Sequence, residues 1–173
     1  MLINIIKRAR IVKAQASSHE LNVFLHNEYN IEEIERYLDD FCRLDDYDVL
    51  ATIKLWINHP DKILSILCKS IINRRLLKVK YSGKIMTHEI VKEKTALVKR
   101  YLNINDEEAS YLVFTGETGN KTYNTQDEHI NILFKDGEIK DISEVDNALI
   151  NQTLFGTVKK FYICFPNMEQ III

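Results

Sequence analysis

Hydrophobic positions in the first part of the chain recur with the spacing of amphipathic α-helices. Residues 1–16 carry an apolar stripe formed by Leu2, Ile5, Ile6, Ala9 and Val12. Four basic residues surround this stripe: Lys7, Arg8, Arg10 and Lys13. We expect a helix that packs on the core, although a basic segment without acids is also typical of an organelle-targeting peptide. A second stripe, Ile31, Ile34, Tyr37 and Leu38, predicts another helix.

Two further helices are predicted on either side of Pro60. Asp45, followed three residues later by Asp48, has the spacing of a capping box. The helix behind it should end at Asn58-His59, because a residue before proline avoids the helical conformation. Pro60 then suits the first helical position, with Asp61 in the first turn of a helix that runs to about Ile72.

From Leu77 onward the pattern alternates between strands and helices. Strands are predicted at 78–81, 109–115, 129–135, 138–142 and 158–165. Asp136-Gly137 fits a two-residue hairpin turn. Helices are predicted from Thr87 to about Leu102 and over 144–154, the second with Ser143 and Asp146 as a capping box.

These elements predict an α+β protein with two parts. Residues 1–76 form a helical region, and residues 77–173 form a small domain with the β-α-β-β-α-β order of a ferredoxin-like unit and an extra hairpin strand. The length of 173 residues suits one domain or two small ones, and 46% apolar residues suffice for a core.

The charge and the cysteine content limit the classes of binding partner and the cellular compartment that we expect. The formal net charge is -2 and is spread evenly, which argues against nucleic-acid and membrane-surface partners. Cys42, Cys68 and Cys164 form no CxxC pair, so we expect neither a zinc site nor a disulfide framework, but a reducing cytoplasm. No apolar run approaches the length of a membrane span.

The stretch LDDYDVLATIKLWINHPD places Asp45, Asp46, Asp48, His59 and Asp61 close together in the sequence, and these are the residue types that a metal-dependent hydrolase uses as ligands. Their positions at predicted helix starts favour capping over metal ligation. No GxSxG, GxxxxGK[ST], GxGxxG or HExxH motif occurs, and no histidine is followed by aspartate. Gly116 and Gly119 are better suited to shaping a loop than to holding a phosphate. We therefore predict no catalytic residue, no metal ligand and no cofactor in this chain.

One basic cluster is the remaining candidate for chemistry. Arg74, Arg75, Lys78 and Lys80 converge where a predicted helix ends and a strand begins. Cations there complement the helix dipole, and the same arrangement can bind an anion through charge-assisted hydrogen bonds. Both interpretations stay open at this point.

The segment LDDYDVLATIKLWINHPDKILSILCKSIINRRLLKVKY resembles the helical region after the catalytic centre of HD-domain phosphohydrolases of the deoxynucleoside triphosphate triphosphohydrolase (SAM-and-HD-domain) type. Arg74-Arg-Leu-Leu-Lys78 stands where that family has Arg-Asn-Leu-Phe-Lys before a strand. Residues 1–10 and 109–165 are similar to parts of bacterial members.

This resemblance implies a C-terminal, non-catalytic region of such an enzyme. The family's His, His-Asp and Asp ligands have no counterpart here, so a divalent metal is expected in the parent catalytic domain. The implied partners are that upstream HD domain, other copies in a homo-oligomer, and a nucleotide effector. On residue matching, Arg74, Leu76 and Lys78 inherit the effector-nucleotide site; Arg75 and Leu77 depart from the family pattern.

A different class of function is also compatible with the sequence. A free-standing ferredoxin-like module could bind a protein or small ligand through a sheet face or edge, with Tyr111 and Tyr123 contributing. Nucleic-acid binding is disfavoured, because the charge is balanced and no aromatic RNP-type strand is present.

Overall fold

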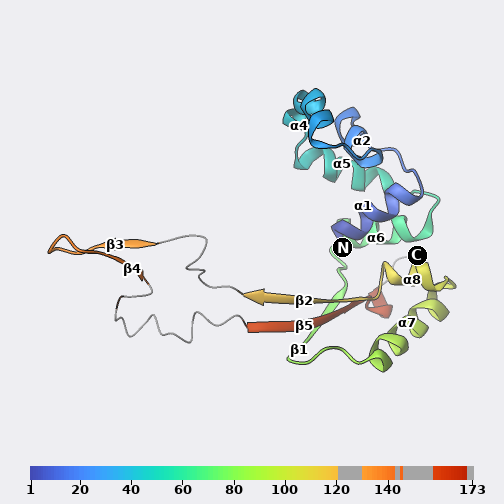
Figure 1. Cartoon of the computed structure of the whole chain (residues 1–173). Coiled ribbons are helices and arrows are strands. Elements are labelled where there is room, and N and C mark those ends of the chain that lie inside the picture. Colours follow the sequence, from blue (N-terminus) through green and yellow to red (C-terminus); the bar gives the residue numbers. More distant parts are fainter. Residues whose placement is uncertain (121–129, 143–144, 146–157, 171–173) are drawn as a thin grey trace. The chain divides into compact units, whose positions relative to one another are not determined.

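The computed structural model describes residues 1–120, 130–142, 145 and 158–170 (Figure 1). The chain separates into two compact units. The first comprises 1–80, 87–114 and 163–173, and the second comprises 81–86 and 115–162. Helices occupy most of residues 1–72 and the first strand starts at Lys78. The predicted division into domains at residue 76 stays a prediction.

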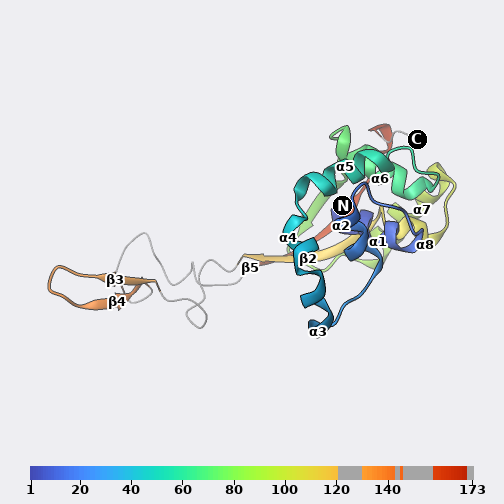
Figure 2. The same ribbon diagram turned by 90° about the horizontal axis from the view of Figure 1, so that it is seen from above.

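Nine described helical segments belong to the first unit up to Ser110: α1 (Leu2–Ile11), α2 (His19–His26), α3 (Ile31–Ile34), η1 (Glu35–Tyr37), α4 (Leu38–Arg43), α5 (Asp46–Trp56), α6 (Lys62–Ile72), α7 (His88–Leu102) and α8 (Asp106–Ser110). A short 3-10 helix, η4 (Met168–Gln170), follows the last strand. The view from above in Figure 2 shows α1 lying close to α6.

The core of the first unit contains apolar residues of α1, α5 and α6, although Leu2 of the predicted stripe on α1 is 47% exposed. Ile5, Ile53, Trp56, Ile63 and Leu64 are all buried. The indole N–H of Trp56 donates to the carbonyl of Gln15 over 2.8 Å, which joins α5 to the segment after α1. Because a buried indole needs a hydrogen-bond acceptor, this contact satisfies the one polar atom of the largest core side chain.

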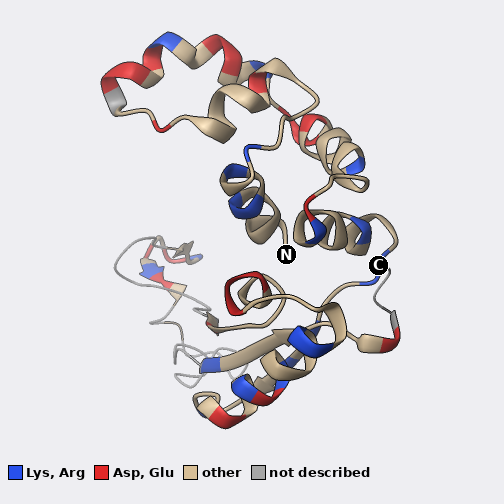
Figure 3. Cartoon of the chain, turned by 90° about the vertical axis from the view of Figure 1, so that its right-hand side faces the viewer, with Lys and Arg blue, Asp and Glu red and all other residues tan. Residues whose placement is uncertain are grey.

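The segment predicted as one helix over residues 31–38 is divided. It begins with a capping box between Asn30 and Glu33, continues as α3 and η1, and only then becomes α4. Ile34 and Leu38 on its stripe are 45% and 58% exposed. In the cartoon of Figure 3, red marks acidic residues along this part of the chain and blue marks basic residues on α1.

Helix starts around Pro60 follow the prediction with one correction. The carboxylate of Asp45 accepts from the N–H groups of Tyr47 and Asp48, and Asp48 accepts from the N–H of Asp45, so this capping box is confirmed. Pro60 is not the first helical residue. Asp61 is the N-cap of α6 and accepts from the N–H of Leu64 over 2.8 Å. A side-chain cap at Asp61 places the first helical residue at Lys62, two residues later than the predicted start at Pro60.

The strands are β1 (Lys78–Ser82), β2 (Phe114–Asn120), β3 (Asn131–Leu133), β4 (Ile139–Asp141) and β5 (Val158–Phe165). The strand predicted over 109–115 exists but starts later: α8 ends at Ser110 and β2 runs from Phe114 to Asn120, so the bounds of the prediction are wrong. Asn105 and Glu108 form a capping box that starts α8. This local signal outweighs the apolar run behind it.

The predicted hairpin is confirmed, but its turn is longer than predicted. Leu133 pairs with Ile139. The N–H of Phe134 donates to Glu138 and the N–H of Gly137 donates to Phe134, which leaves a three-residue connection. Gly137 has a φ of 90°, the left-handed conformation that such a connection requires and glycine adopts without strain.

The α+β class is confirmed. An antiparallel three-stranded sheet has the order β1-β5-β2, while β3 and β4 form a separate two-stranded sheet. A ferredoxin-like unit would combine its strands in one sheet. The order of the described strands along the chain therefore agrees with the prediction better than their pairing does, because they do not form the single sheet of a ferredoxin-like unit. The helix predicted over 144–154 lies outside the described residues.

Candidate functional site

The basic segment that follows α6 contains the residues predicted to bind an effector. Arg74, Leu76 and Lys78 are all exposed, and Leu76 exposes 58% of its surface. Leu77 between them is buried, and its N–H contacts the sulfur of Met1 at 3.4 Å. Apart from Leu77, residues 74–80 are all exposed, so the three predicted site residues face solvent.

Arg74 ends α6 in an unusual backbone conformation. Its N–H donates to Ile71, and the N–H of Arg75 donates to Ser70, which is the Schellman pattern of a helix C-terminus. In this pattern the residue after the C-cap has a left-handed backbone conformation, and here it is Arg74, with a φ of 56°. Glycine is the usual residue here because a side chain in this conformation costs about 1–2 kcal/mol. The left-handed backbone of Arg74 therefore carries a local conformational cost that glycine would not have.

Arg75 does not join the other cations at a shared cavity. It lines a cavity of about 10 Å³ with Leu77, Leu112, Pro166 and Asn167. Such a volume holds about one water molecule. Lys80 is exposed in β1. The structure thus places Arg74, Leu76 and Lys78 on one exposed stretch, and the small cavity beside Arg75 is lined by none of the other three predicted cations.

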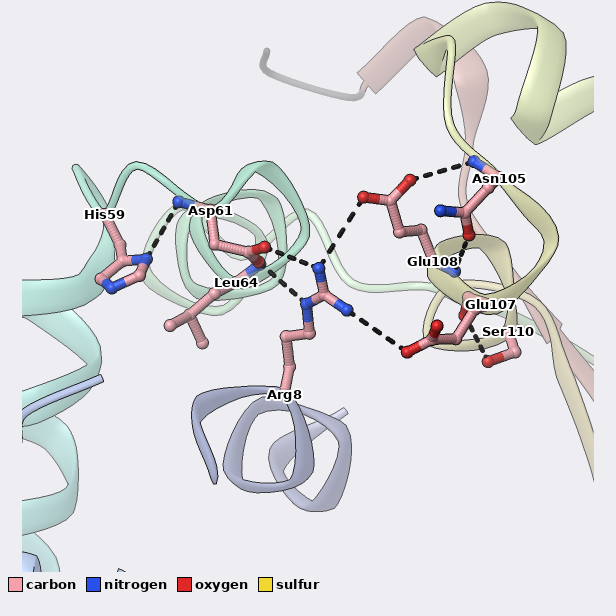
Figure 4. Close-up of polar contacts among 8 residues, drawn as sticks. All are labelled: Arg8, His59, Asp61, Leu64, Asn105, Glu107, Glu108 and Ser110. Atoms are coloured by element: carbon pink, nitrogen blue, oxygen red, sulfur yellow. Dashed lines mark hydrogen bonds and ion pairs between the residues drawn. The ribbon is translucent and has the colours of Figure 1, made fainter. Parts of the chain in front are cut away.

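A second polar cluster escaped the sequence analysis. Arg8, predicted at the margin of the first helix, is only 8% exposed. Its guanidinium donates to Asp61 through Nε to Oδ1 at 3.1 Å and through Nη2 to Oδ2 at 2.7 Å (Figure 4). Glu107 and Glu108 lie 3.8 and 3.7 Å away, and the guanidinium is 5.4 Å from the centre of the Tyr111 ring.

The electrostatics of this cluster hold Arg8 and Asp61 in their charged forms. Burial by itself would raise the pKa of Asp61, but the hydrogen bonds from Arg8 and from the N–H of Leu64 outweigh it and lower that pKa. The hydrogen bond to Asp61 raises the pKa of Arg8. Since Asp61 also caps α6, one carboxylate links α1 to the start of another helix.

Arg8 also forms ion pairs with residues of α8. Glu108 belongs to the capping box of that helix, and its second oxygen accepts from the N–H of Asn105 (Figure 4). Tyr111, predicted as an exposed binding residue, is half-buried beside Arg8 instead. Tyr123 lies outside the described residues. The arrangement joins α1, α6 and α8 through the hydrogen bonds and ion pairs of Arg8.

The acidic residues around Pro60 have structural partners. Asp45 and Asp48 cap α5, Asp61 pairs with Arg8, and the ring Nδ1 of His59 accepts from the N–H of Asp61 over 3.0 Å. Within residues 1–120, 130–142, 145 and 158–170, no group of three or more His, Cys, Asp or Glu could hold a metal ion. The donor set of this part of the chain does not fit a divalent metal.

Two other properties bear on the setting of the chain. None of the helices that the structure describes has both the length and the apolar character needed to cross a lipid bilayer. Cys42, Cys68 and Cys164 are free thiols, and burial raises the pKa of Cys68 to about 12. At neutral pH this thiol therefore stays protonated and unreactive.

Comparison with known proteins gives one informative result. No protein-family model matches the chain, and no curated protein does. Among solved structures, it is similar to a phosphohydrolase from Bacteroides thetaiotaomicron, with 34% sequence identity and a TM-score of 0.80. The match covers 96% of this chain and 43% of that protein. The chain is thus related to a phosphohydrolase, and it spans less than half of that protein's length.

Proposed function

We propose that this chain is a C-terminal, non-catalytic region of an HD-superfamily phosphohydrolase that acts on nucleotide phosphates. The observation that carries the proposal is the match to a phosphohydrolase along 96% of the chain at 34% identity, over 43% of the larger protein. A catalytic HD domain that precedes this region would supply the divalent metal and the reacting groups. The setting would be a reducing cytoplasm, which the three free thiols support.

This region would contribute an effector-nucleotide site at Arg74, Leu76 and Lys78. Arg74 and Lys78 supply cations that can neutralise phosphate oxygens, and the exposed Leu76 supplies an apolar surface between them. The strained backbone of Arg74 supports a role for its side chain, since glycine would end the helix at lower cost. Exposure leaves these side chains accessible to a ligand or to another subunit.

The region would also contribute oligomer contacts. Ile34, Leu38 and Phe41 have the spacing of one helical stripe and are 45%, 58% and 59% exposed. Apolar side chains grouped in this way are typical of interaction surfaces. We assign this stripe to a contact between copies of the chain.

Binding to the proposed effector site can be tested with the 173-residue chain itself. Amide NMR spectra recorded during addition of dGTP or GTP should shift at residues 74–78. A variant with Arg74→Ala and Lys78→Ala should lose the shifts, while the control Arg100→Ala, an exposed arginine on α7, should keep them. Equal loss in both variants, or no shift at 74–78 in the unchanged chain, would contradict the effector site.

Two further measurements test the other parts of the proposal. The chain incubated with dGTP and Mn²⁺ should release no product above a protein-free control, and saturable turnover would show that it is catalytic. Sedimentation should detect an oligomer that Ile34→Glu with Leu38→Glu dissociates. The exposed Leu133→Glu serves as the matched control, and a monomeric unchanged chain would refute the oligomer contact.

A further inference from the structure

A cavity of about 580 Å³ lies where α1 and α2 end. It is lined by Arg10 and Lys13 from the end of α1, by Gln15 beyond it, and by Leu25, His26, Asn27 and Glu28 around the end of α2. Its size lies within the range of small-ligand sites. The effector site proposed above is not part of it: Arg74 follows the C-terminus of α6, and none of the lining residues belongs to that segment.

The walls of this cavity are fixed to one another by hydrogen bonds. Arg10 donates from Nη2 to the carbonyl of Phe24 over 3.1 Å, and Nε2 of His26 lies 2.9 Å from the carbonyl of Ala14. Both contacts join the α1 side to the α2 side. Because the bond from Arg10 uses Nη2, the Nε and Nη1 groups of its guanidinium are left to donate elsewhere. The cavity is therefore held open before any ligand arrives.

Lys13 has the same unusual conformation as Arg74. Its φ is 52°, its N–H donates to Arg10 and the N–H of Ala14 donates to Ala9, which is again a Schellman ending. Three non-glycine residues in the described chain have a positive φ: Lys13, Arg74 and Asn103. Asparagine is a residue type that tolerates this conformation. A cation near a helix end suits the dipole, but that does not explain a lysine where glycine is favoured.

The charge of the cavity is positive overall. Arg10 and Lys13 are permanent cations at neutral pH, and Glu28 is the single carboxylate on the lining. In the part of the chain that the structure describes, no ion pair engages Arg10, Lys13 or Glu28. Two cations facing one space match the double charge of a phosphate monoester at neutral pH.

We infer that the cavity between the ends of α1 and α2 binds a phosphate group, with Arg10 and Lys13 as its charged ligands. Asn27 and Gln15 line the same space and can donate from their amides to phosphate oxygens or to an attached group. The ligand is either free inorganic phosphate or pyrophosphate, or the phosphate of a nucleotide. This inference does not rest on the proposed phosphohydrolase origin.

The test uses Lys13→Gly, because it separates binding from folding. Glycine removes the ammonium group and also relieves the left-handed strain, so the variant should melt at a higher temperature than the unchanged chain. In calorimetric titrations with sodium pyrophosphate, its affinity should nevertheless fall at least about tenfold, as expected for the loss of one charge-assisted hydrogen bond. Lys7→Ala, an exposed cation of α1 outside the cavity, should retain the original affinity.

Parallel titrations with inorganic phosphate, pyrophosphate and ATP distinguish the two sources of the phosphate group. Tighter binding of ATP than of pyrophosphate assigns a nucleotide, and the reverse assigns the free anion. Amide shifts at Lys13, His26 and Asn27 should accompany binding and should persist in the variant with Arg74→Ala and Lys78→Ala. No saturable binding of any probe, equal weakening by Lys7→Ala and Lys13→Gly, or loss of these shifts in the Arg74 and Lys78 variant would each overturn the inference.

Discussion

Arg8 and Asp61, 53 positions apart in the sequence, are joined by two hydrogen bonds of 3.1 and 2.7 Å between a guanidinium and a carboxylate. The two side chains are 10% and 15% exposed, so each would be costly to leave without the other. Because Asp61 also caps α6, the pair couples the position of α1 to the first turn of α6. We regard this pair as the main polar contact between the helices of the first unit.

Replacement of Arg8 by methionine should be strongly destabilising. Methionine keeps much of the volume but leaves the Asp61 carboxylate without its guanidinium. We expect the free energy of unfolding to fall by about 2–4 kcal/mol, somewhat below the range for fully buried pairs because both side chains retain some exposure. Urea unfolding followed by circular dichroism measures the change. Lys7→Met on the exposed side of α1 is the control and should change stability by less than about 0.5 kcal/mol.

The same pair predicts how stability depends on acid. The pKa of Asp61 is lower in the folded chain than its ordinary value of 3.8. A lowered folded pKa gives stability that is fully present above the unfolded pKa and is lost as pH falls through the folded pKa. Asp61→Asn preserves the cap but removes this titration. The stability difference between the unchanged chain and Asp61→Asn should be constant above about pH 5 and shrink below pH 3.8. A difference that is unchanged down to pH 2 would contradict the pairing.

A close approach in the second unit gives a test of its packing. A Cβ atom added at Gly116 would lie 2.4 Å from Oη and 2.5 Å from Cζ of Tyr162, whose ring also packs edge-on against Tyr81. Gly116→Ala should therefore lower the unfolding free energy by about 1–3 kcal/mol, the usual cost of overpacking. Gly83→Ala, where nothing lies within 4 Å, is the matched control.

Rescue by a second substitution shows whether the tyrosine ring is the cause. In a double-mutant cycle, Gly116→Ala should cost much less when Tyr162 is already alanine, because the obstructing ring has been removed. If Gly116→Ala costs the same with and without the ring, the loss comes from the backbone and not from this contact. Thermal unfolding monitored by circular dichroism supplies all four values.

The features that the sequence predicts well depend on interactions between residues that are close together in the sequence. Asp45 and Asp48 cap a helix because their oxygens and the free N–H groups lie within one turn. The hairpin around Gly137 was predictable for the same reason, although dipeptide preference alone gave the wrong length of turn. The error at residues 109–115 was avoidable, since Asn105 and Glu108 already have the spacing of a capping box.

The candidate sites depend on contacts that local patterns do not contain. Arg8 lies three residues after Ile5 and directly before Ala9, on the buried face, so its position gave one signal of burial. Nothing near Arg8 in the sequence identifies Asp61 as its partner. The left-handed conformations of Lys13 and Arg74 also depend on where each helix ends. The left-handed position itself is neither glycine nor asparagine in these two cases, although Asn73 is the C-cap of α6.

Arg74→Gly should stabilise the chain while removing a proposed effector ligand. Glycine adopts the φ of 56° without the steric cost that a Cβ atom brings, although it also gives the unfolded chain more freedom. The balance should be a gain of about 1 kcal/mol in unfolding free energy at this helix end. Arg74→Ala keeps the Cβ atom and should show no such gain, so the pair separates backbone strain from the loss of the guanidinium. Urea unfolding of both variants measures the difference. Equal stability of the alanine and glycine variants would mean that the left-handed conformation is not strained, and the backbone argument for a role of Arg74 in binding would fail.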